Sequence, residues 1–229
     1  MSFPTTSEGP SEEAAAAWES TRERRARITW SLIAEPSDAV AMLACAVLGP
    51  VDALELARHG SGPDLLRALG GQLPTQASDP GAGNPPARAA RALARWRARL
   101  TPHGLDEALA DAARRGLRII TPLDSEWPRA LDDLQESRPH CLWVQGPGRL
   151  DQLVSGRSAA LVGSRASTPY GEDTASSFAA AFAASGGTVV SGGAYGIDAA
   201  AHRGALAADA GATIAVLAGG LDRLYPRGN

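Results

Sequence analysis

Three short apolar runs, each closed by a glycine-containing turn, occupy the last third of this 229-residue chain. They lie at Ala159–Val162, Thr188–Val190 and Thr213–Ala218, and helical patterns over Tyr170–Ser185 and Ile197–Asp209 separate them. Apolar runs that alternate with helices are typical of parallel strands joined by crossover helices. We therefore expect an α/β fold with a parallel sheet in this part of the chain.

Two of the turns follow the carboxyl ends of successive strands, where open α/β sheets bind their ligands. Glycine lets backbone N–H groups approach an anion closely, and arginine adds a planar positive fork. The helices that follow direct free N–H groups toward the same place. The turns predict a site for a phosphate-bearing ligand, although the glycines could also serve only to make tight turns. The residues concerned are Gly163, Ser164, Arg165, Ser191, Gly192, Gly193, Ala194, Tyr195 and Gly196.

Common nucleotide and hydrolase motifs do not fit these turns. The dinucleotide fingerprint G-x-G-x-x-G is absent after the first strand, and G-x-x-x-x-G-K-[ST] does not occur. Neither Ser164 nor Ser191 lies in a G-x-S-x-G elbow, which argues against an α/β-hydrolase.

Two pairs of side chains lie four residues apart in the expected helices. Phe178 and Phe182 are expected to face the sheet as core residues. Asp198 and His202 could form an acid/base pair. We favour structural roles for both, with Asp198 as a first-turn acid and His202 as a packed residue.

The rest of the chain is less distinctive. The pattern divides it into a disordered tail (1–23), a helical domain (24–115) with a Pro- and Gly-rich loop (72–86), a connecting segment (116–157) and the α/β domain (158–229). Candidate strands at Leu117–Thr121 and Cys141–Val144 lie in the connecting segment.

The helix expected over Ala87–Leu100 carries arginines along one side. Their spacing of three, four and four residues places them on a common face. A solvated charged face is the favoured interpretation, and an auxiliary contact to phosphates is the alternative. The arginines are Arg88, Arg91, Arg95 and Arg99.

Composition restricts the function only weakly. The net charge of −3 gives no global argument for nucleic acid, and every cation is arginine, because the chain has no lysine. Cys45 and Cys141 lack ligand spacing and are expected to be buried free thiols, so no metal is expected. The sequence shows no signal peptide and no membrane span, so we expect a cytoplasmic protein.

Three ordered blocks resemble the signatures of the DprA/Smf family of DNA-processing proteins. The first is VGSR at Val162–Arg165 followed by Tyr170-Gly171, the second is SGGAYGIDAAAHRGAL at Ser191–Leu206, and the third is TIAVLAGGLDRLYPRGN at Thr213–Asn229. The segment Asp124–Gly146 is also similar to the family. The last block ends at Asn229, so we expect a member shortened at its C-terminus.

The resemblance implies an incomplete, extended Rossmann fold of the DprA type behind a helical, SAM-like or helix-hairpin domain. It implies a non-enzymatic protein without a cofactor, which binds and protects single-stranded DNA and assists RecA loading in natural transformation. It places Arg165, Tyr170, Gly171 and the Ser191–Gly196 turn in the DNA-binding pocket, and it implies a homodimer for the full-length protein. The alternatives are a phosphoribohydrolase-like enzyme, whose P-G-G-x-G-T-x-x-E motif is absent, and a fragment without function.

Overall fold

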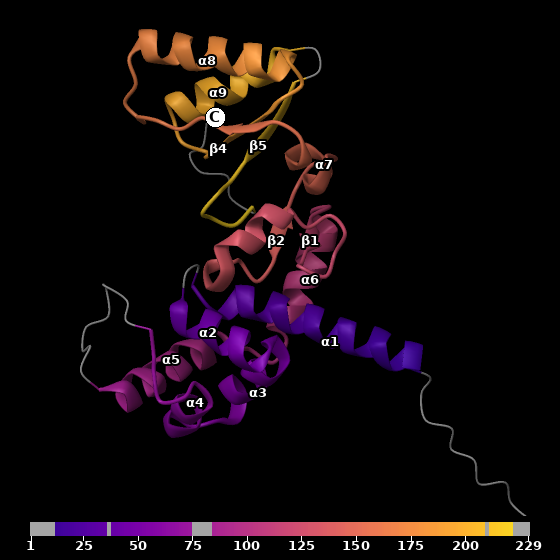
Figure 1. Ribbon diagram of the computed structural model, residues 1–229, viewed down its shortest axis with the longest axis vertical. Helices are drawn as coiled ribbons and strands as arrows, with labels where there is room; N and C mark the ends of the chain where they lie inside the picture. The colour runs from indigo at the N-terminus through magenta and orange to yellow at the C-terminus, as the bar shows by residue number, and fades with distance from the viewer. Residues whose placement is uncertain (1–11, 36–37, 75–83, 209–210, 222–229) are drawn as a thin grey trace, which may run out of the picture. The chain divides into compact units, whose positions relative to one another are not determined.

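The computed structural model describes residues 12–35, 38–74, 84–208 and 211–221. The chain divides into two compact units (Figure 1). The first comprises the residues up to Ser125 together with Arg129–Val144, and the second comprises Glu126–Pro128 and the residues from Gln145 onward. The division therefore falls inside the segment 116–157, which we expected to connect the two domains.

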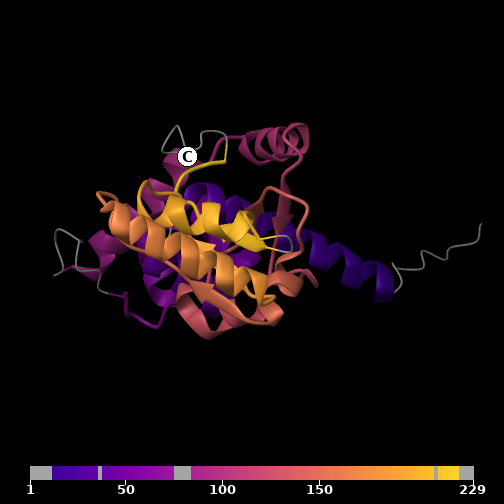
Figure 2. The ribbon, with the colours of Figure 1, turned by 90° about the horizontal axis from the view of Figure 1, so that it is seen from above.

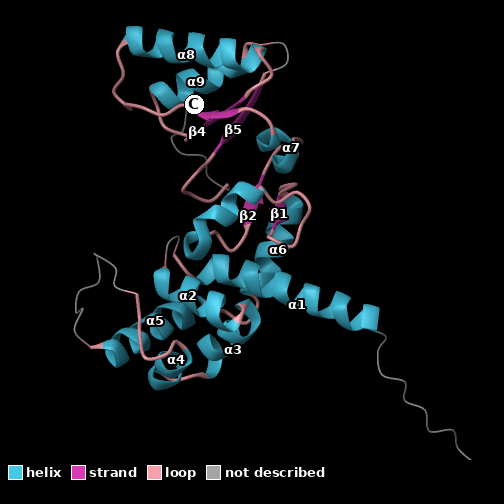
Figure 3. Cartoon of the chain, viewed as in Figure 1, coloured by secondary structure: helices cyan, strands magenta, loops and turns pink. Residues whose placement is uncertain are grey.

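Helices form most of the first unit (Figure 3). Their ends follow local sequence signals. Proline stands at the first or second position of α3, α4 and α5, and Ser61 forms a capping box with Asp64 at the start of α4. The helices are α1 (Glu12–Ile33), α2 (Ala39–Leu48), α3 (Pro50–His59), α4 (Gly62–Ala68), α5 (Pro85–Arg99) and α6 (Gly104–Arg114).

Two of these boundaries differ from the expectation. Helix α1 begins at Glu12, so the second half of the expected tail is helical, because its run of glutamate and alanine has high helix propensity. Residues 1–11 lie outside the described part. Helix α5 begins at Pro85, inside the expected loop 72–86. Asn84 is the N-cap of this helix and accepts a hydrogen bond from the Ala87 N–H. Residues 75–83 of that loop also lie outside the described part.

Helices α2 and α3 meet at Gly49, whose φ of 78° lies in the left-handed region that glycine adopts readily. The helix direction turns by 119° between them. Within the described residues, no single helix has the length and apolar character needed to cross a bilayer; α2 and α3 meet that criterion only as a bent pair.

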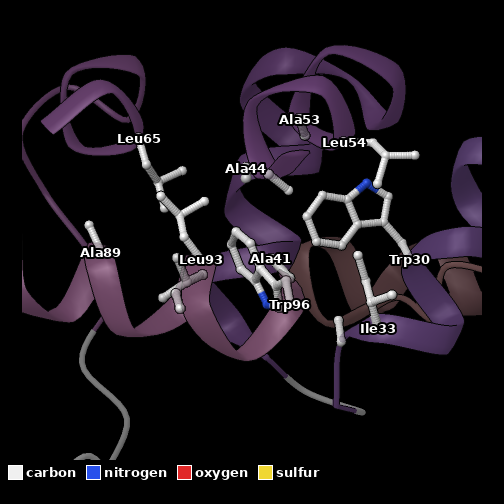
Figure 4. Packing of buried hydrophobic residues seen from close by; sticks show 14 of the residues in the cluster. Trp30, Ile33, Ala41, Ala44, Ala53, Leu54, Leu65, Ala89, Leu93 and Trp96 are labelled. Carbon is white, nitrogen blue, oxygen red and sulfur yellow. The ribbon is translucent and has the colours of Figure 1, made fainter. Parts of the chain in front are cut away.

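The core of the first unit is built around two tryptophans (Figure 4). The rings of Trp30 in α1 and Trp96 in α5 meet edge to face, with centroids 5.0 Å apart. Both side chains are almost fully buried, together with Ile33, Ala41 and Leu93. Short side chains on α2 and α3 let these helices approach the indole rings closely.

One carboxylate links this core to two helices. Asp38 is 5% exposed, and its Oδ1 accepts the N–H groups of Val40 and Ala41 at 3.1 Å, which caps α2. Its Oδ2 accepts the Trp96 Nε1–H at 3.0 Å and the Arg95 guanidinium at 3.3 Å. A single side chain thus accepts hydrogen bonds from the backbone at the start of α2 and from two side chains of α5.

The expected arginine face of α5 is only partly a solvated face. Arg88 is 6% exposed and donates to the Pro74 carbonyl, which contradicts a wholly solvated row. Arg95 pairs with Asp38, and Arg99 pairs with Glu35. These guanidinium groups therefore bond to a short loop and to the start of a helix. The spacing of the arginines within α5 could not predict these contacts.

Two short antiparallel strands complete the first unit. Strand β1 (Arg118–Ile120) pairs with β2 (Leu142–Val144), and the 3₁₀ segment η1 (Arg129–Ser137) lies between them in the sequence. Asp124 accepts the Thr121 N–H at 2.7 Å and pairs with Arg24 of α1, which also donates to the Ile119 carbonyl. These contacts join the strands to the helices.

His140 has a buried ring nitrogen without a hydrogen-bond partner in the described part of this unit. It is 8% exposed and stacks on Trp30 at a centroid distance of 5.8 Å, and its Nε2 has no hydrogen-bond partner among the described residues. Burial, reinforced by the Arg27 charge, lowers the pKa of His140 to about 4. Both cysteines are free thiols, but only Cys141 is buried as expected, whereas Cys45 is half-buried; burial raises the pKa of Cys141 to about 11.

The stability of the first unit should therefore depend on pH through His140. Its pKa is lowered on folding, so the unfolded chain takes up a proton first, and stability is lost as the pH falls from about 6.5 toward 4. We expect the free energy of unfolding to be about 2 kcal/mol lower at pH 5 than at pH 7.5. Urea unfolding followed by tryptophan fluorescence measures it. His140→Phe keeps a ring against Trp30 and should remove most of this difference; an equal pH dependence in the variant would assign it to other groups.

The second unit contains a three-stranded parallel sheet in the order β3-β4-β5. Ala159, Val189 and Thr213 are aligned across the sheet. The α/β fold with a parallel sheet, expected from the sequence, is thus present. Its elements are α7 (Leu150–Ser155), β3 (Ser158–Ala160), α8 (Pro169–Ala184), β4 (Thr188–Ser191), α9 (Ile197–Leu206) and β5 (Ala212–Ala215).

Helices α8 and α9 lie side by side on one face of this sheet (Figures 1 and 2). Their contact is made by small residues. Ala179, Ala183, Ala201 and Ala205 are fully buried, and a Cβ added at Gly204 would lie 2.1 Å from the Ser176 carbonyl oxygen. The two helices therefore approach each other nearly backbone to backbone.

The prediction that both phenylalanines of α8 face the sheet is wrong for one of them. Phe182 packs against the buried cluster, but Phe178 is 56% exposed. The buried stripe of α8 consists of Ala179 and Ala183, and Phe178 lies beside that stripe. An i,i+4 spacing shows that two residues share a face but does not show which face is buried.

The opposite face of the sheet is apolar and open within the described part of this unit. Val190 and Ile214 are aligned on that face and are half-buried. Val162 and Val216, which follow β3 and β5, are 71% and 64% exposed. The apolar surface at the carboxyl ends of these strands thus adjoins the turns that follow them.

Candidate functional site

The first glycine turn connects β3 to α8 and is held by its own polar side chains. Ser164 Oγ donates to the Ala166 carbonyl at 3.0 Å. Thr168 caps α8 by accepting the Gly171 N–H at 3.2 Å, and Ser167 donates to Glu172 at 2.6 Å. The turn therefore has a fixed shape before any ligand binds.

The second glycine turn, Ser191–Gly196, is fixed from below by α9. Asp198 is 7% exposed and accepts the Ala194 N–H at 3.3 Å. His202 Nε2 lies 2.8 Å from the Gly192 carbonyl, which can only accept, so this nitrogen carries the proton. His202 Nδ1 lies 2.7 Å from the Thr213 hydroxyl of β5. These contacts agree with the structural roles favoured for Asp198 and His202.

The two turns fit against each other at glycines where no side chain has room. Gly196 has a φ of 77°, and a Cβ there would lie 2.4 Å from the Ser164 carbonyl oxygen. A Cβ at Gly163 would lie 2.6 Å from the Ile197 side chain, and Gly171 adjoins the same side chain. The Ile197 N–H donates to the Ser164 carbonyl at 3.2 Å. The structure thus brings the predicted residues of both turns together.

Three large side chains of the predicted site are exposed. Tyr170 in the first turn of α8 is 80% exposed, and Tyr195 in the second turn is 47% exposed. Arg165 is also exposed, and within the described residues its guanidinium has no hydrogen bond or ion pair. A positive fork without a partner among the described residues, together with aromatic rings in the second turn and at the start of α8, can bind an anion and stack on a planar group.

Ser191 does not belong to the exposed part of the site. It is 3% exposed, and its hydroxyl donates at 2.5 Å to the carbonyl of Leu161, the residue that follows β3, so it cannot reach a ligand. Fewer backbone N–H groups than expected are free to bind a ligand at the helix starts, because those of Ile197 and Gly171 already donate within the protein. Gly192, Gly193 and Ala194 are half-buried and shape the turn.

Sequence reasoning missed the polar residues that hold the first turn. Glu172 accepts from Ser167 through one oxygen and from Arg203 of α9 through the other, at 3.3 Å. The only available signal was Thr168-Pro169, a helix-start pattern in which a cap precedes proline. In the described residues, no group of three or more His, Cys, Asp or Glu side chains could hold a metal ion.

Known proteins match this region of the chain. The sequence profile described as "DNA recombination-mediator protein A" matches residues 118–229. A protein of Mycobacterium tuberculosis named for DprA is 51% identical over 126 residues, which cover 51% of this chain and 32% of that protein. The "DNA processing protein DprA" of Bacillus subtilis is 33% identical over 125 residues, which cover 55% of this chain and 41% of that protein. The matched region thus spans 32% to 41% of the length of these relatives.

A solved structure supports the same fold. The X-ray structure of DNA processing protein A (DprA) from Streptococcus pneumoniae aligns with a TM-score of 0.53 and 24% sequence identity. The alignment covers 90% of this chain and 60% of that chain. It therefore includes the helical region as well as the parallel sheet.

Proposed function

Because the chain belongs to the DprA/Smf family of DNA-processing proteins, we propose that it binds single-stranded DNA through the two glycine turns of its second unit. Arg165 binds a backbone phosphate, and Tyr170 and Tyr195 offer ring faces to unpaired bases. Base stacking on aromatic rings tolerates any base, and phosphate contacts carry no sequence information. The proposed ligand is thus a strand of arbitrary sequence.

The observation that carries this proposal is the state of Arg165. Other arginines of the second unit have partners: Arg149 pairs with Asp151, Arg203 pairs with Glu172, and Arg157 stacks on Phe182. Arg165 has none within the described residues, although it lies in a turn whose shape is fixed by other hydrogen bonds. A rigid turn that presents an uncommitted guanidinium suits recognition of an external phosphate.

A binding role also agrees with the contacts of Asp198 and His202, the two side chains of this unit best suited to catalysis. Asp198 and His202 are engaged by the backbone of the second turn and by Thr213. We therefore propose a mediator of recombination rather than a phosphoribohydrolase-like enzyme. Protection of incoming DNA, RecA loading and dimerisation are proposed for the complete protein, because the matched region spans only part of the relatives.

Arg165→Ala should weaken binding of a fluorescein-labelled single-stranded oligonucleotide about ten- to a hundredfold, because a charged hydrogen bond contributes about 1–3 kcal/mol. Fluorescence anisotropy at fixed salt measures the dissociation constant. Arg149→Ala is the matched control, since Arg149 is an exposed arginine of the same unit that already pairs with Asp151. Equal affinities for wild type and a folded Arg165→Ala variant would refute the proposed role.

A further inference from the structure

The outward face of helix α5 in the first unit is basic. Its inward face is apolar and buried through Ala89, Leu93 and Trp96 (Figure 4), and Ala92 is buried as well. Within Pro85–Arg99 the sequence has no acidic residue. The exposed arginines of this helix are Arg91, Arg95, Arg97 and Arg99.

Arg97 differs from Arg95 and Arg99 in the kind of partner that it has. Arg95 and Arg99 each pair with a carboxylate, from Asp38 and Glu35. Arg97 donates its Nε–H to the Ala57 carbonyl at 2.7 Å and an Nη2–H to the Gly60 carbonyl, and no carboxylate among the described residues pairs with it. The two carbonyls orient the guanidinium but leave its positive charge unneutralised.

Arg97 lines an open cavity of about 450 Å³ at the side of α5. The other lining residues are Arg58, Leu100, Thr101 and Pro102. Arg58 pairs with Glu55 at 2.8 Å, which offsets part of its charge, and its side chain is 41% exposed. The cavity therefore combines two guanidinium groups, a hydroxyl-bearing residue and apolar walls, within the size range of small-ligand sites.

We propose that this cavity is a second contact for single-stranded DNA, in which Arg97 and Arg58 bind backbone phosphates and Leu100 and Pro102 contact a sugar or base. The proposal rests on the function proposed above. A held, planar guanidinium matches the geometry of phosphate oxygens, and an apolar wall beside it suits a nucleotide. An acidic protein segment is the competing occupant, and the test separates the two.

The test compares binding of a 30-nucleotide single-stranded oligonucleotide to the whole chain over a range of salt concentrations. Arg58→Gln combined with Arg97→Gln should weaken binding about tenfold at low salt. The plot of log affinity against log salt should become less steep by about 1.4, since each phosphate contact to a single strand contributes about 0.7. Arg114→Gln on α6 should change neither quantity, because Arg114 pairs with an acid as Arg58 does but does not line the cavity.

The outcomes separate this inference from the proposed function. If Arg165→Ala weakens binding and the Arg58/Arg97 double variant does not, the cavity is not a DNA contact and the glycine-turn site stands. If wild type does not bind the oligonucleotide, both proposals fail. If poly-glutamate of equal charge displaces the DNA from wild type but not from the double variant, the cavity binds acidic polymers in general and the phosphate assignment is wrong.

A second variant tests the proposal even if the double variant does not fold. Arg97 holds the end of α3 through two carbonyls, so its loss could loosen the unit. Arg58→Gln alone spares these bonds and should still reduce the salt slope by about 0.7. Circular dichroism before each titration confirms that a variant has its helices, and an unchanged slope in a folded Arg58→Gln variant contradicts the proposal.

Discussion

Gly204→Ala is expected to lower the free energy of unfolding of the second unit by about 3 kcal/mol, despite the better helix propensity of alanine. The added Cβ would lie 2.1 Å from the Ser176 carbonyl oxygen and 2.8 Å from its Cα. Both are backbone atoms of α8, so no side chain can move aside. The helices must separate instead, which opens the packing at Ala179, Ala183, Ala201 and Ala205.

Guanidinium unfolding followed by far-UV circular dichroism measures this loss, and hydrogen exchange of peptides from α8 and α9 locates it. Gly156→Ala is the matched control in the same unit, because its φ is −96° and a Cβ there meets no atom within 4 Å. If Gly204→Ala is as stable as this control, the close approach of the two helices does not exist in solution.

Asp38→Ala is expected to destabilise the first unit by about 4 kcal/mol. The substitution removes the N-cap of α2, which contributes about 1 kcal/mol, and leaves the buried Trp96 indole N–H without its acceptor, which costs about 1–3 kcal/mol. The second N–H of the cap and the Arg95 contact are lost as well.

Asp38→Asn separates these contributions. The amide oxygen can still cap α2, but the amide NH₂ would face the donor of Trp96, so about half of the loss should remain. Urea unfolding followed by tryptophan fluorescence reports directly on Trp30 and Trp96, which are buried in this unit. A loss below about 1 kcal/mol in Asp38→Ala would show that water replaces the carboxylate without penalty.

The strands and turns of the second unit were predictable because glycine marks them so strongly. Each apolar run became a parallel strand, with ends shifted by no more than three residues, since strand ends depend on pairing partners rather than on local sequence. The contact between the turns at Gly196 and Ile197 was not predictable. It depends on how α9 is placed against the first turn, which no local pattern encodes.

The misplaced side chains share a cause. Ser191, Phe178 and Arg88 were assigned from their chemistry and spacing, but their neighbours in space decide their roles. Ser191 lies beside the Leu161 carbonyl, Phe178 lies next to a stripe of alanines, and Arg88 lies beside the Pro74 carbonyl. Periodicity identifies a shared face, whereas the partner that covers the face comes from distant parts of the chain.

The arginines of α5 have a further consequence for the ends of other helices. The last carbonyl groups of a helix lack intrahelical partners and carry the negative end of its macrodipole. Helix α1 has no basic residue in its last turn, yet Arg99 donates to the Ile33 carbonyl at that end, at 3.5 Å. Arg97 does the same for the last turn of α3. Helix α5 thus supplies a positive charge to the C-terminal end of α1, which has none in its last turn, and adds one to Arg58 and His59 at the end of α3.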